Sequence, residues 1–478
     1  MQRALLIAEK PSLMRDIQSA YNSLKKNGKL SGLEIDFDHF VGHIVSAKTP
    51  DKLNEKYKDR KDTSYLPIMD EMKFEPITKT RSVYSQIKTK IHSGKYDFLI
   101  NACDPAREGQ NIFATSTNLM GNKLPVKRLW SSSTTENALS KALESLIDSS
   151  DPKLSRMTKV ALLRTMFDWR IGMNFTRAYN QNTIGRVRTV CLAILAQREK
   201  EIEKFVPEDY FLIDAIFMTR TGEEYVGRYV EVDQEGKVTP ARFKSHEDAD
   251  AIKMTRKSQI KKIDKTTKSS KAPKLFSLGQ LQKAAGKAFK MKPKKVLSIC
   301  QSLYETHKIL SYPRTSSEYL TTDEPAVFPD LFKAIGEVPE VASYVNNITQ
   351  VDQDRIARDK TYVNNDYVED HTALIPTDKK PDLSKLSADE KAIYLMVVKR
   401  FVAIFMPERI EEKSILLTES NSNYFRTSGL IVKQAGWSEL LSTKKDTLLP
   451  VVAEGEIVKG MKKDVLAKQT TPPSRYTQ

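Results

Sequence analysis

Three carboxylate side chains stand out as candidate metal ligands. Glu9 follows a short apolar stretch, and Asp104 and Glu108 lie in "DPAREG" after a second one. Mg²⁺ prefers oxygen ligands and often takes only one or two protein carboxylates together with water and phosphate. The alternative for Asp104 and Glu108 is ordinary capping of a helix N-terminus, where acidic side chains are favoured.

A tyrosine beside a cation is a second candidate for chemistry. Tyr312 is followed by Pro313 and Arg314 in "ILSYPRTSSEYL". A phenol is a weak nucleophile at neutral pH unless a cation favours the phenolate or a base takes its proton. Arg314 offers that charge and also suits a phosphate. His371, in "HTALIPT", is a third candidate, although a lone histidine is usually structural and "YPRT" is more often a turn.

The stretches around the acidic residues predict strands of a parallel sheet. Residues 4–7 and 98–102 have the composition of buried strands, and each is followed by a turn and a helical pattern. In an open parallel sheet, functional groups gather at the carboxyl ends of the strands. We therefore expect the three carboxylates to converge on one edge of this sheet.

The rest of the chain alternates between helical and strand-like segments. Residues 154–203 show helical periodicity, whereas residues 209–238 alternate in a way that favours strands. Helical patterns return at 296–307 and 387–406, and strand patterns return after them. An antiparallel sheet that the chain enters twice, with a helical domain inserted between, explains this order.

Positive charge is concentrated in one stretch. The chain has 77 Lys and Arg against 61 Asp and Glu, a net charge of +16, which favours a polyanionic partner. Residues 253–295 hold fifteen of these cations and the single acid Asp264. Either this stretch is a solvated charge run, or its second half is an amphipathic helix, since apolar residues recur there at helical spacing.

The cysteine and hydropathy patterns exclude several classes of protein. Cys103, Cys191 and Cys300 are widely separated and form no CxxC pair, so neither a disulfide framework nor a zinc site is predicted, and a cytoplasmic location is expected. No stretch approaches the roughly 18–20 apolar residues of a spanning helix, so no membrane partner is expected. The N-terminus does not have the pattern of a signal peptide.

Eight motifs, in order and over nearly the whole chain, resemble those of the type IA DNA topoisomerases, and among them the topoisomerase III-like branch. They are "IAEKPS" (7–12), "FVGHIVSAKTP" (40–50), "DPAREG" (104–109), "LRTMFDWRIGMNFTRAYN" (163–180), "IGRVRT" (184–189), "KEIEKFVPEDYF" (200–211), "SLYETHKILSYPRTSS" (302–317) and "HTALIPT" (371–377). Chance matches do not keep family order in this way.

The resemblance implies an α/β multidomain protein arranged as a toroidal type IA core with a shortened C-terminal part. The expected domains are a TOPRIM domain with a parallel sheet (1–150), a helical DNA-binding segment (151–208), an antiparallel β arch (209–275 and 405–462), a helical domain with the nucleophilic tyrosine (276–404) and a tail (463–478).

The resemblance also implies an ATP-independent isomerase that acts on DNA. Tyr312 would attack a phosphate of a single strand and stay joined to the 5′ phosphate while a second strand passes, before religation. Arg314 and Lys10 would stabilise the phosphate, Glu9 would transfer protons, and His371 would organise the phosphate or assist proton transfer. Mg²⁺ would be held by Glu9, Asp104 and Glu108.

A single-strand groove is implied in the same way. Its expected lining residues are Trp169, Arg177, Thr183, Ile184, Gly185, Arg186, Val187 and Arg188. Aromatic stacking combined with phosphate contacts tolerates many sequences. For Trp169, packing in the core between helices is an equally good interpretation.

The chain departs from the family pattern in several places. Ala106 replaces the middle acid of a DxDxE motif, which removes one expected Mg²⁺ ligand, and Arg188 and Val190 replace residues of the usual GRVQTPT. The sequence stops at "TTPPSRYTQ", where family members continue through a GxGT-type motif. Either the sequence is a piece of a longer protein, or the protein is a minimal version, or another chain supplies the rest.

The sequence also allows two other functions. A DNA-binding remnant that keeps the fold without full strand passage is favoured by Ala106 and the short C-terminus. A TOPRIM nuclease or primase is disfavoured because it gives Tyr312 and His371 no role. A helicase and a separate C-terminal chain are candidate protein partners.

Overall fold

The computed structural model describes residues 1–132, 136–180, 183–368, 371–441 and 447–477. Its contacts divide the chain into two compact units, each described here by itself. Unit 1 comprises Met1–Ile194, Leu275–Glu337 and Asp354–Val397, and unit 2 comprises Leu195–Lys274, Val338–Gln353 and Val398–Gln478.

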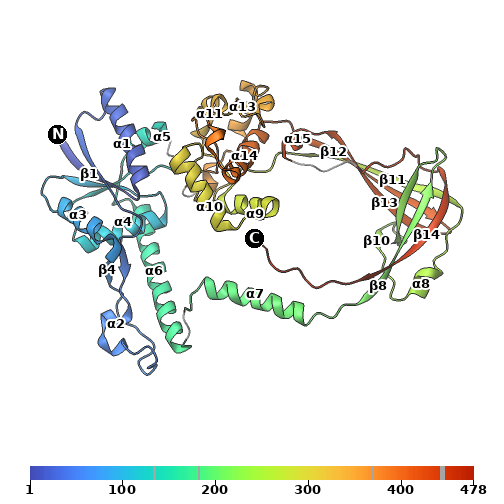
Figure 1. Ribbon diagram of the computed structural model, residues 1–478, viewed down its shortest axis with the longest axis horizontal. Helices are drawn as coiled ribbons and strands as arrows, with labels where there is room; N and C mark the ends of the chain where they lie inside the picture. Colours follow the sequence, from blue (N-terminus) through green and yellow to red (C-terminus); the bar gives the residue numbers. More distant parts are fainter. Residues whose placement is uncertain (133–135, 181–182, 369–370, 442–446, 478) are drawn as a thin grey trace. The chain divides into compact units, whose positions relative to one another are not determined.

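A five-stranded sheet is the centre of the N-terminal part of unit 1 (Figure 1). The strand order is β2-β1-β5-β6-β7, with parallel pairing throughout except between β6 and β7. The strands are β1 (Gln2–Ala8), β2 (Leu33–His39), β5 (Phe98–Ala102), β6 (Val126–Arg128) and β7 (Ile147–Asp148). The two strands predicted as buried, β1 and β5, therefore lie side by side in the middle of the sheet.

Helices cover both faces of this sheet because alternate residues of β1 point to opposite sides. Ala4, Leu6 and Ala8 pack with residues of α1 (Pro11–Lys26) and α5 (Glu136–Glu144). Leu5 and Ile7 pack with residues of α3 (Arg81–Ile91) and α4 (Arg107–Met120) on the other face. A strand buried on both faces reads as a continuous apolar run, which is why "ALLIA" was recognisable in the sequence.

The remaining elements of the N-terminal part extend from this sheet. Two short strands, β3 (Val45–Ala47) and β4 (Phe74–Pro76), pair antiparallel, and α2 (Pro50–Leu53) follows β3. The long helix α6 (Pro152–Ala178) begins at Asp151, whose side chain caps its first turn. Helix α7 (Arg188–Glu203) runs from unit 1 into unit 2.

Helices make up most of the second part of unit 1, which carries Tyr312. They are α9 (Leu278–Phe289), α10 (Pro293–Ser302), a π-helical turn (Leu303–His307), α11 (Phe328–Ile335), the end of α13 (Gln350–Arg358) and the start of α14 (Ala388–Ala403). Helices α9 and α14 fall where helical patterns were predicted.

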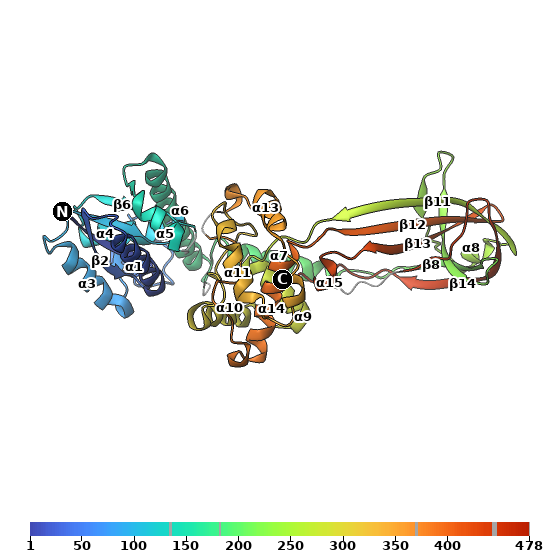
Figure 2. The ribbon, with the colours of Figure 1, turned by 90° about the horizontal axis from the view of Figure 1, so that it is seen from above.

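Unit 2 is built on a seven-stranded antiparallel sheet, whose long strands are seen in Figure 2. Strand β8 pairs with both β14 and β9, so the sheet closes on itself. The strands are β8 (Asp209–Met218), β9 (Glu224–Val232), β10 (Val238–Pro240), β11 (Lys257–Ser270), β12 (Arg409–Ser420), β13 (Asn423–Gln434) and β14 (Ile457–Gln469). Three short helices accompany them: α8 (His246–Ala251), α12 (Ala342–Val345) and α15 (Ser438–Leu441).

The predicted fold class, an α/β protein with a parallel sheet, helical parts and an antiparallel β part, is confirmed. The antiparallel sheet is entered twice, because β8–β11 precede the Tyr312 segment and β12–β14 follow it. Among the described residues, no helix is both long and apolar enough to cross a membrane.

The basic stretch is divided between two elements. Its first half contains strand β11, which pairs with β12, and its second half forms the predicted helix, α9. One expected boundary needs correction. The tail was expected to begin at residue 463, but β14 continues to Gln469 because its backbone pairs with β8 down to Asp209.

The turn between β5 and α4 is closely packed. Gly109, in the first turn of α4, lies against the backbone of Asp104, and a Cβ atom at this position would be 2.2 Å from the Asp104 carbonyl oxygen. Only glycine permits this approach, so Gly109 helps to fix where the Asp104 side chain starts.

We expect Gly109→Ala to lower the stability of the protein by about 1–3 kcal/mol, because an added methyl group in a closely packed site forces the backbone to shift. The measurement is the midpoint of urea unfolding. Gly279→Ala is the matched control, since Gly279 lies in α9 with no atom within 4 Å of the added Cβ. Equal midpoints for the two variants would contradict this packing argument.

The start of α14 is held by a capping box that also contacts the π-helical turn. The Glu390 carboxylate accepts hydrogen bonds from the Ser387 N–H (2.9 Å), the Ser387 hydroxyl (2.7 Å) and the Ser302 hydroxyl (2.7 Å). His307 Nε2 lies 3.5 Å from the same carboxylate. These hydrogen bonds, with that from Ser302 foremost, lower the pKa of Glu390 to about 2.

This depressed pKa predicts a specific acid sensitivity. Because the folded pKa lies below the unfolded value of about 4.3, the contribution of Glu390 is present above about pH 5 and is lost as the pH falls from about 4 toward 2. We expect Glu390→Gln to cost about 1–2 kcal/mol at pH 7 and less below pH 3. Urea unfolding of wild type, Glu390→Gln and the exposed-site control Glu71→Gln at several pH values measures this; a cost independent of pH would contradict it.

Candidate active site

The edge of the parallel sheet brings two acidic residues together. Ala8 at the end of β1 is paired with Ala102 at the end of β5, so Glu9 and Asp104 follow neighbouring strand ends. The Asp104 backbone N–H donates a hydrogen bond of 3.2 Å to Glu9 Oε2. Two of the three carboxylates expected at this edge, Glu9 and Asp104, therefore lie together there.

A lysine lies beside the two carboxylates. Lys10 Nζ donates to Asp104 Oδ2 at 3.3 Å, and both side chains are largely buried. Burial favours the neutral amine, but the charge of Asp104 and the contact with Tyr312 outweigh it, so the pKa of Lys10 is raised. This position therefore holds a fixed positive charge.

The two carboxylates differ in their tendency to hold a proton. Burial, together with the neighbouring charge of Asp104, raises the pKa of Glu9. Burial also opposes ionisation of Asp104, but His371 and Lys10 outweigh it and hold the pKa of Asp104 below its usual range. A pair of titratable groups whose pKa values are shifted in opposite directions is typical of acid–base sites.

The Tyr312 segment is held against the segment that carries His371. The Ser311 N–H donates to the Ile375 carbonyl at 3.0 Å, and the Thr315 hydroxyl donates to the His371 carbonyl at 2.8 Å. Pro313 between them is buried. This pairing brings the rings of Tyr312 and His371 to a centroid distance of 4.4 Å.

The two parts of the site meet at Lys10. Its Nζ lies 3.4 Å from the centre of the Tyr312 ring, and His371 Nε2 lies 3.5 Å from Asp104 Oδ2. The second distance is too long for a strong hydrogen bond, so we treat it as an electrostatic contact. The structure thus gathers a phenol, an ammonium group, an imidazole and two carboxylates at one point.

Two buried polar atoms of this cluster have no hydrogen-bond partner among the described residues. They are Asp104 Oδ1 and His371 Nε2. Buried polar atoms are usually satisfied, and an unsatisfied one has a specific cause, such as strain, a catalytic role or a bound water or ion. Glu9 and Asp104, with one free carboxylate oxygen, fit a divalent cation such as Mg²⁺ that takes its other ligands from water and phosphate.

Glu108 does not join this pair. Its side chain is exposed and its Oε1 lies 2.5 Å from His43 Nε2, a contact that lowers the pKa of Glu108 and raises that of His43. Among the described residues, no group of three His, Cys, Asp or Glu side chains is placed to hold a metal ion. The expected three-carboxylate set is therefore not formed, because a nearby imidazole holds the third.

Arg314 is also placed differently from the expectation. Its side chain is exposed and, in the part of the chain that the structure describes, it makes no hydrogen bond or ion pair. Tyr312 therefore has Lys10, and not Arg314, as its cationic neighbour. Arg314 is left free to meet a ligand that approaches from solvent.

The expected groove residues divide into a buried and an exposed set. Trp169 is 6% exposed, packs with Tyr57 and Ile68, and donates its indole N–H to the Lys48 carbonyl at 2.9 Å. Arg177 is also buried and donates to the Tyr57 carbonyl at 3.4 Å. Both side chains have packing roles here, which for Trp169 was the alternative interpretation.

The other groove residues lie in the link between α6 and α7 and at the first residue of α7. Thr183, Arg186, Val187 and Arg188 are exposed, and Ile184 and Gly185 are half-buried. Arg186 pairs with Asp168 at 2.8 Å, and its guanidinium lies 5.4 Å from the exposed Phe167 ring. This link therefore presents cations and an aromatic ring, as a nucleic-acid surface requires.

Sequence reasoning missed Arg128. It is 1% exposed and donates to the Asn101 carbonyl (2.9 Å), Asn101 Oδ1 (3.0 Å) and the Asp104 carbonyl (2.7 Å), and burial lowers its pKa to about 10. It therefore fixes the backbone that carries Asp104. One arginine in "PVKRLW" gave no signal by itself, because its partners are known only once β6 is paired with β5.

The chain is similar to known DNA topoisomerases. A family model described as DNA topoisomerase matches residues 153–478. DNA topoisomerase 3 of Bacillus subtilis is 30% identical over 496 residues, and that of Staphylococcus epidermidis is 31% identical over 487 residues. Each alignment covers 100% of this chain and 66% of the relative, so the chain spans slightly less than two thirds of their length.

A solved structure has a similar fold. Full-length topoisomerase I from Thermotoga maritima matches with a TM-score of 0.67 at 20% identity, over 99% of this chain and 73% of that one. At this level of identity the likeness concerns the fold alone.

The burial of Trp169 leads to a prediction that separates packing from stacking. We expect Trp169→Phe to cost about 1–2 kcal/mol of stability, because the Lys48 carbonyl loses its donor, and to leave the affinity for single-stranded DNA unchanged. Phe167→Ala on the same helix is the matched variant. It should barely change stability, since Phe167 is 50% exposed, but should weaken DNA binding.

Urea unfolding and fluorescence anisotropy with a labelled oligonucleotide, on the same samples, measure the two effects. A loss of affinity in Trp169→Phe without a loss of stability would contradict the packing role.

Proposed function

Because the chain belongs to the DNA topoisomerase family, and to its type IA branch, we propose that it cleaves and rejoins one DNA strand through Tyr312. The observation that carries this proposal is the Lys10 ammonium, 3.4 Å from the Tyr312 ring centre and 3.3 Å from Asp104 Oδ2. A phenol beside a fixed cation and an acid–base pair is the arrangement that nucleophilic attack on a phosphate needs.

The proposed reaction exchanges one phosphodiester for another. The Tyr312 phenol oxygen attacks the phosphorus, its proton passes to a base, and the bond from phosphorus to the 3′ oxygen breaks. The 3′ oxygen takes a proton, and the 5′ phosphate stays on Tyr312. Religation is the reverse of these steps, so no ATP is required, and a second strand passes while the break is open.

The two carboxylates have different parts in this scheme. Glu9, whose pKa is raised, is suited to hand a proton to the leaving 3′ oxygen and to take it back on religation. Asp104, whose pKa is lowered, stays ionised and keeps Lys10 charged and in place. The two roles are not interchangeable, because each depends on the surroundings that shift the pKa of that carboxylate.

The cations stabilise the phosphate. Lys10 Nζ is fixed over the Tyr312 ring, and His371 Nε2, which has no hydrogen-bond partner among the described residues, is available to a phosphate oxygen. Arg314, exposed and free of ion pairs among the described residues, can reach the bound strand from solvent. Preorganised charge of this kind is often the largest catalytic contribution, and loss of one donor commonly costs about 10²–10³ in rate.

A Mg²⁺ ion fits beside these groups. Glu9 and Asp104, through its unpartnered Oδ1, are the residues that would hold it. When bound, it would supply charge that draws the strand's phosphates to the site. Glu108, paired with His43, and Ala106 contribute no ligand in this arrangement.

A second function is favoured by one observation, the pairing of Glu108 with His43 away from the site. With only two carboxylates at the sheet edge, the protein would bind single-stranded DNA and lack full strand passage. The proposed cleavage and this alternative differ in whether a covalent intermediate forms.

The covalent intermediate is the test. The protein is incubated with single-stranded DNA labelled at the 5′ or the 3′ end, with and without Mg²⁺, and is then denatured. We expect an adduct that retains the 3′ label, because the 5′ phosphate of the break stays on the protein. Tyr312→Phe should abolish it, since that variant keeps the ring contact with Lys10 but lacks the nucleophilic oxygen.

Tyr319→Phe is the control, because Tyr319 lies in the same segment and stacks on Tyr367 at 4.8 Å, outside the cluster. An adduct that persists in Tyr312→Phe would overturn the assignment. DNA binding with no adduct under any condition would leave the binding function in its place. Relaxation of supercoiled plasmid then tests strand passage separately.

A further inference from the structure

A pocket of about 640 Å³ lies beside the turn that carries Asp104 and is lined by Pro105, Ala106 and Arg107 of that turn. We propose that it binds one nucleotide of the cleaved strand next to the scissile phosphate, with the base against Trp130 and phosphate near Arg107 and Lys153. This inference rests on the proposed function. The volume falls within the range of roughly 300–1,000 Å³ that is usual for small-molecule sites.

Trp130 is placed at this pocket by the same sheet that places Asp104. Asn101 of β5 is paired with Arg128 at the end of β6, so Trp130 emerges at the edge where Glu9 and Asp104 lie. Arg128, fixed by its own hydrogen bonds, lies 5.3 Å from the Trp130 ring centre and supports it. Trp130 is only half-buried and is not a member of the two hydrophobic clusters that pack on the faces of this sheet.

A packing role therefore explains Trp130 less well than it explains Trp169. Trp169 is buried among apolar side chains and its indole N–H is satisfied. Trp130 lines a pocket whose other walls are largely polar and charged. Stacking of a base on the accessible part of an indole is sequence-tolerant, because every base has a π face.

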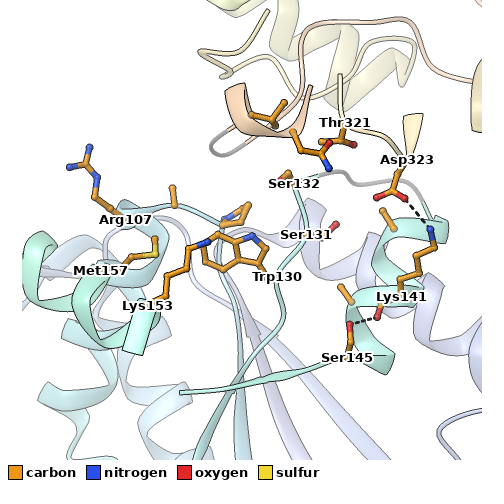
Figure 3. Close-up of a pocket in the computed structure, with 16 residues that line it drawn as sticks. Arg107, Trp130, Ser131, Ser132, Lys141, Ser145, Lys153, Met157, Thr321 and Asp323 are labelled. Carbon is orange, nitrogen blue, oxygen red and sulfur yellow. Dashed lines mark hydrogen bonds and ion pairs between the residues drawn. The ribbon is translucent and has the colours of Figure 1, made fainter. Parts of the chain in front are cut away.

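The charge of the pocket suits a phosphate. Lys141 is paired with Asp323 at 3.0 Å, whereas Arg107 and Lys153 form no ion pair among the described residues. Figure 3 shows the Lys153 side chain beside the Trp130 indole, with Thr321 and Asp323 across the pocket from it. Lys153 Nζ lies 5.4 Å from the ring centre, so one cation and one aromatic face are offered together.

The pocket shares a lining residue with the hollow at Tyr312. Ser132 lines it and also lines the hollow of about 360 Å³ that contains Tyr312 and His371. On the other side, Ala106 and Arg107 are shared with a groove that reaches Arg164 and Asp168 of α6. A strand whose phosphate meets Tyr312 therefore has this pocket as the next recess for a neighbouring nucleotide.

Photo-crosslinking tests which residue the base meets. The full chain carrying Tyr312→Phe, which binds without cleaving, is irradiated with single-stranded DNA that contains 5-iodouracil at one position at a time. We expect one position to crosslink to Trp130, as identified by peptide mass spectrometry. Crosslinks that avoid Trp130 at every position would overturn the proposal.

Affinity measurements test the contribution of the ring. In the same background, Trp130→Ala should weaken binding of the intact strand about 5- to 100-fold. Removal of the base at the crosslinking position should cost a similar factor in the parent protein and little in Trp130→Ala. Trp130→Phe, which keeps a stacking ring, should retain most of the affinity and shows that a loss in the alanine variant is not caused by misfolding.

A salt series tests the cation. Lys153→Ala should reduce the slope of log K against log salt concentration by about one, whereas the exposed control Lys123→Ala should leave it unchanged.

Two outcomes decide between the pocket and the reaction. If removal of the base weakens binding to Trp130→Ala as much as it weakens binding to the parent protein, the nucleotide pocket is excluded. None of these measurements needs cleavage. If the protein forms no Tyr312 adduct but crosslinks through Trp130, the proposed reaction is contradicted and the proposed pocket is supported.

Discussion

The candidate site depends on one ammonium group, that of Lys10, which contacts both the Asp104 carboxylate and the Tyr312 ring. Glu9 and Asp104 are buried close together, and two such carboxylates cannot both ionise without a compensating charge. Lys10 supplies that charge and at the same time joins the sheet edge to a segment some three hundred residues further along the chain. Removing it would leave repelling carboxylates on one side and an isolated phenol on the other.

The sheet makes this arrangement possible through its register. Pairing of Ala8 with Ala102, and of Asn101 with Arg128, brings three strand ends to one edge, so acidic, basic and aromatic side chains arrive there from β1, β5 and β6. The backbone at Asp104 is then held from two directions, by the close approach of Gly109 and by the hydrogen bond from Arg128. The position of the Asp104 side chain is therefore set first by how firmly its backbone is held.

The sequence was informative where local rules act and uninformative where distant contacts decide. Buried strands flanked by turn residues were recognisable for β1 and β5, and strand ends of a parallel sheet meet, so Glu9 and Asp104 were predicted together. Glu108 was assigned to them because it is near in sequence, yet His43, from another loop, holds it. The structural roles of Trp169 and Arg128 were not predictable for the same reason. Their hydrogen-bond acceptors, the Lys48 carbonyl and Asn101 Oδ1, come from elements that no local sequence pattern connects to them.

The unsatisfied atoms of the site show how stability and function are divided. Asp104 Oδ1 and His371 Nε2 are buried and have no hydrogen-bond partner among the described residues, and each such group costs about 1–3 kcal/mol in the free protein. The packed sheet and the pairing of the Tyr312 and His371 segments must hold them in place against this cost. A phosphate and a cation entering the site would satisfy both atoms at once. Because these atoms form no hydrogen bond within the protein, the free energy of satisfying them contributes to binding of the substrate. This is the property of a site that is ordered before its ligand arrives.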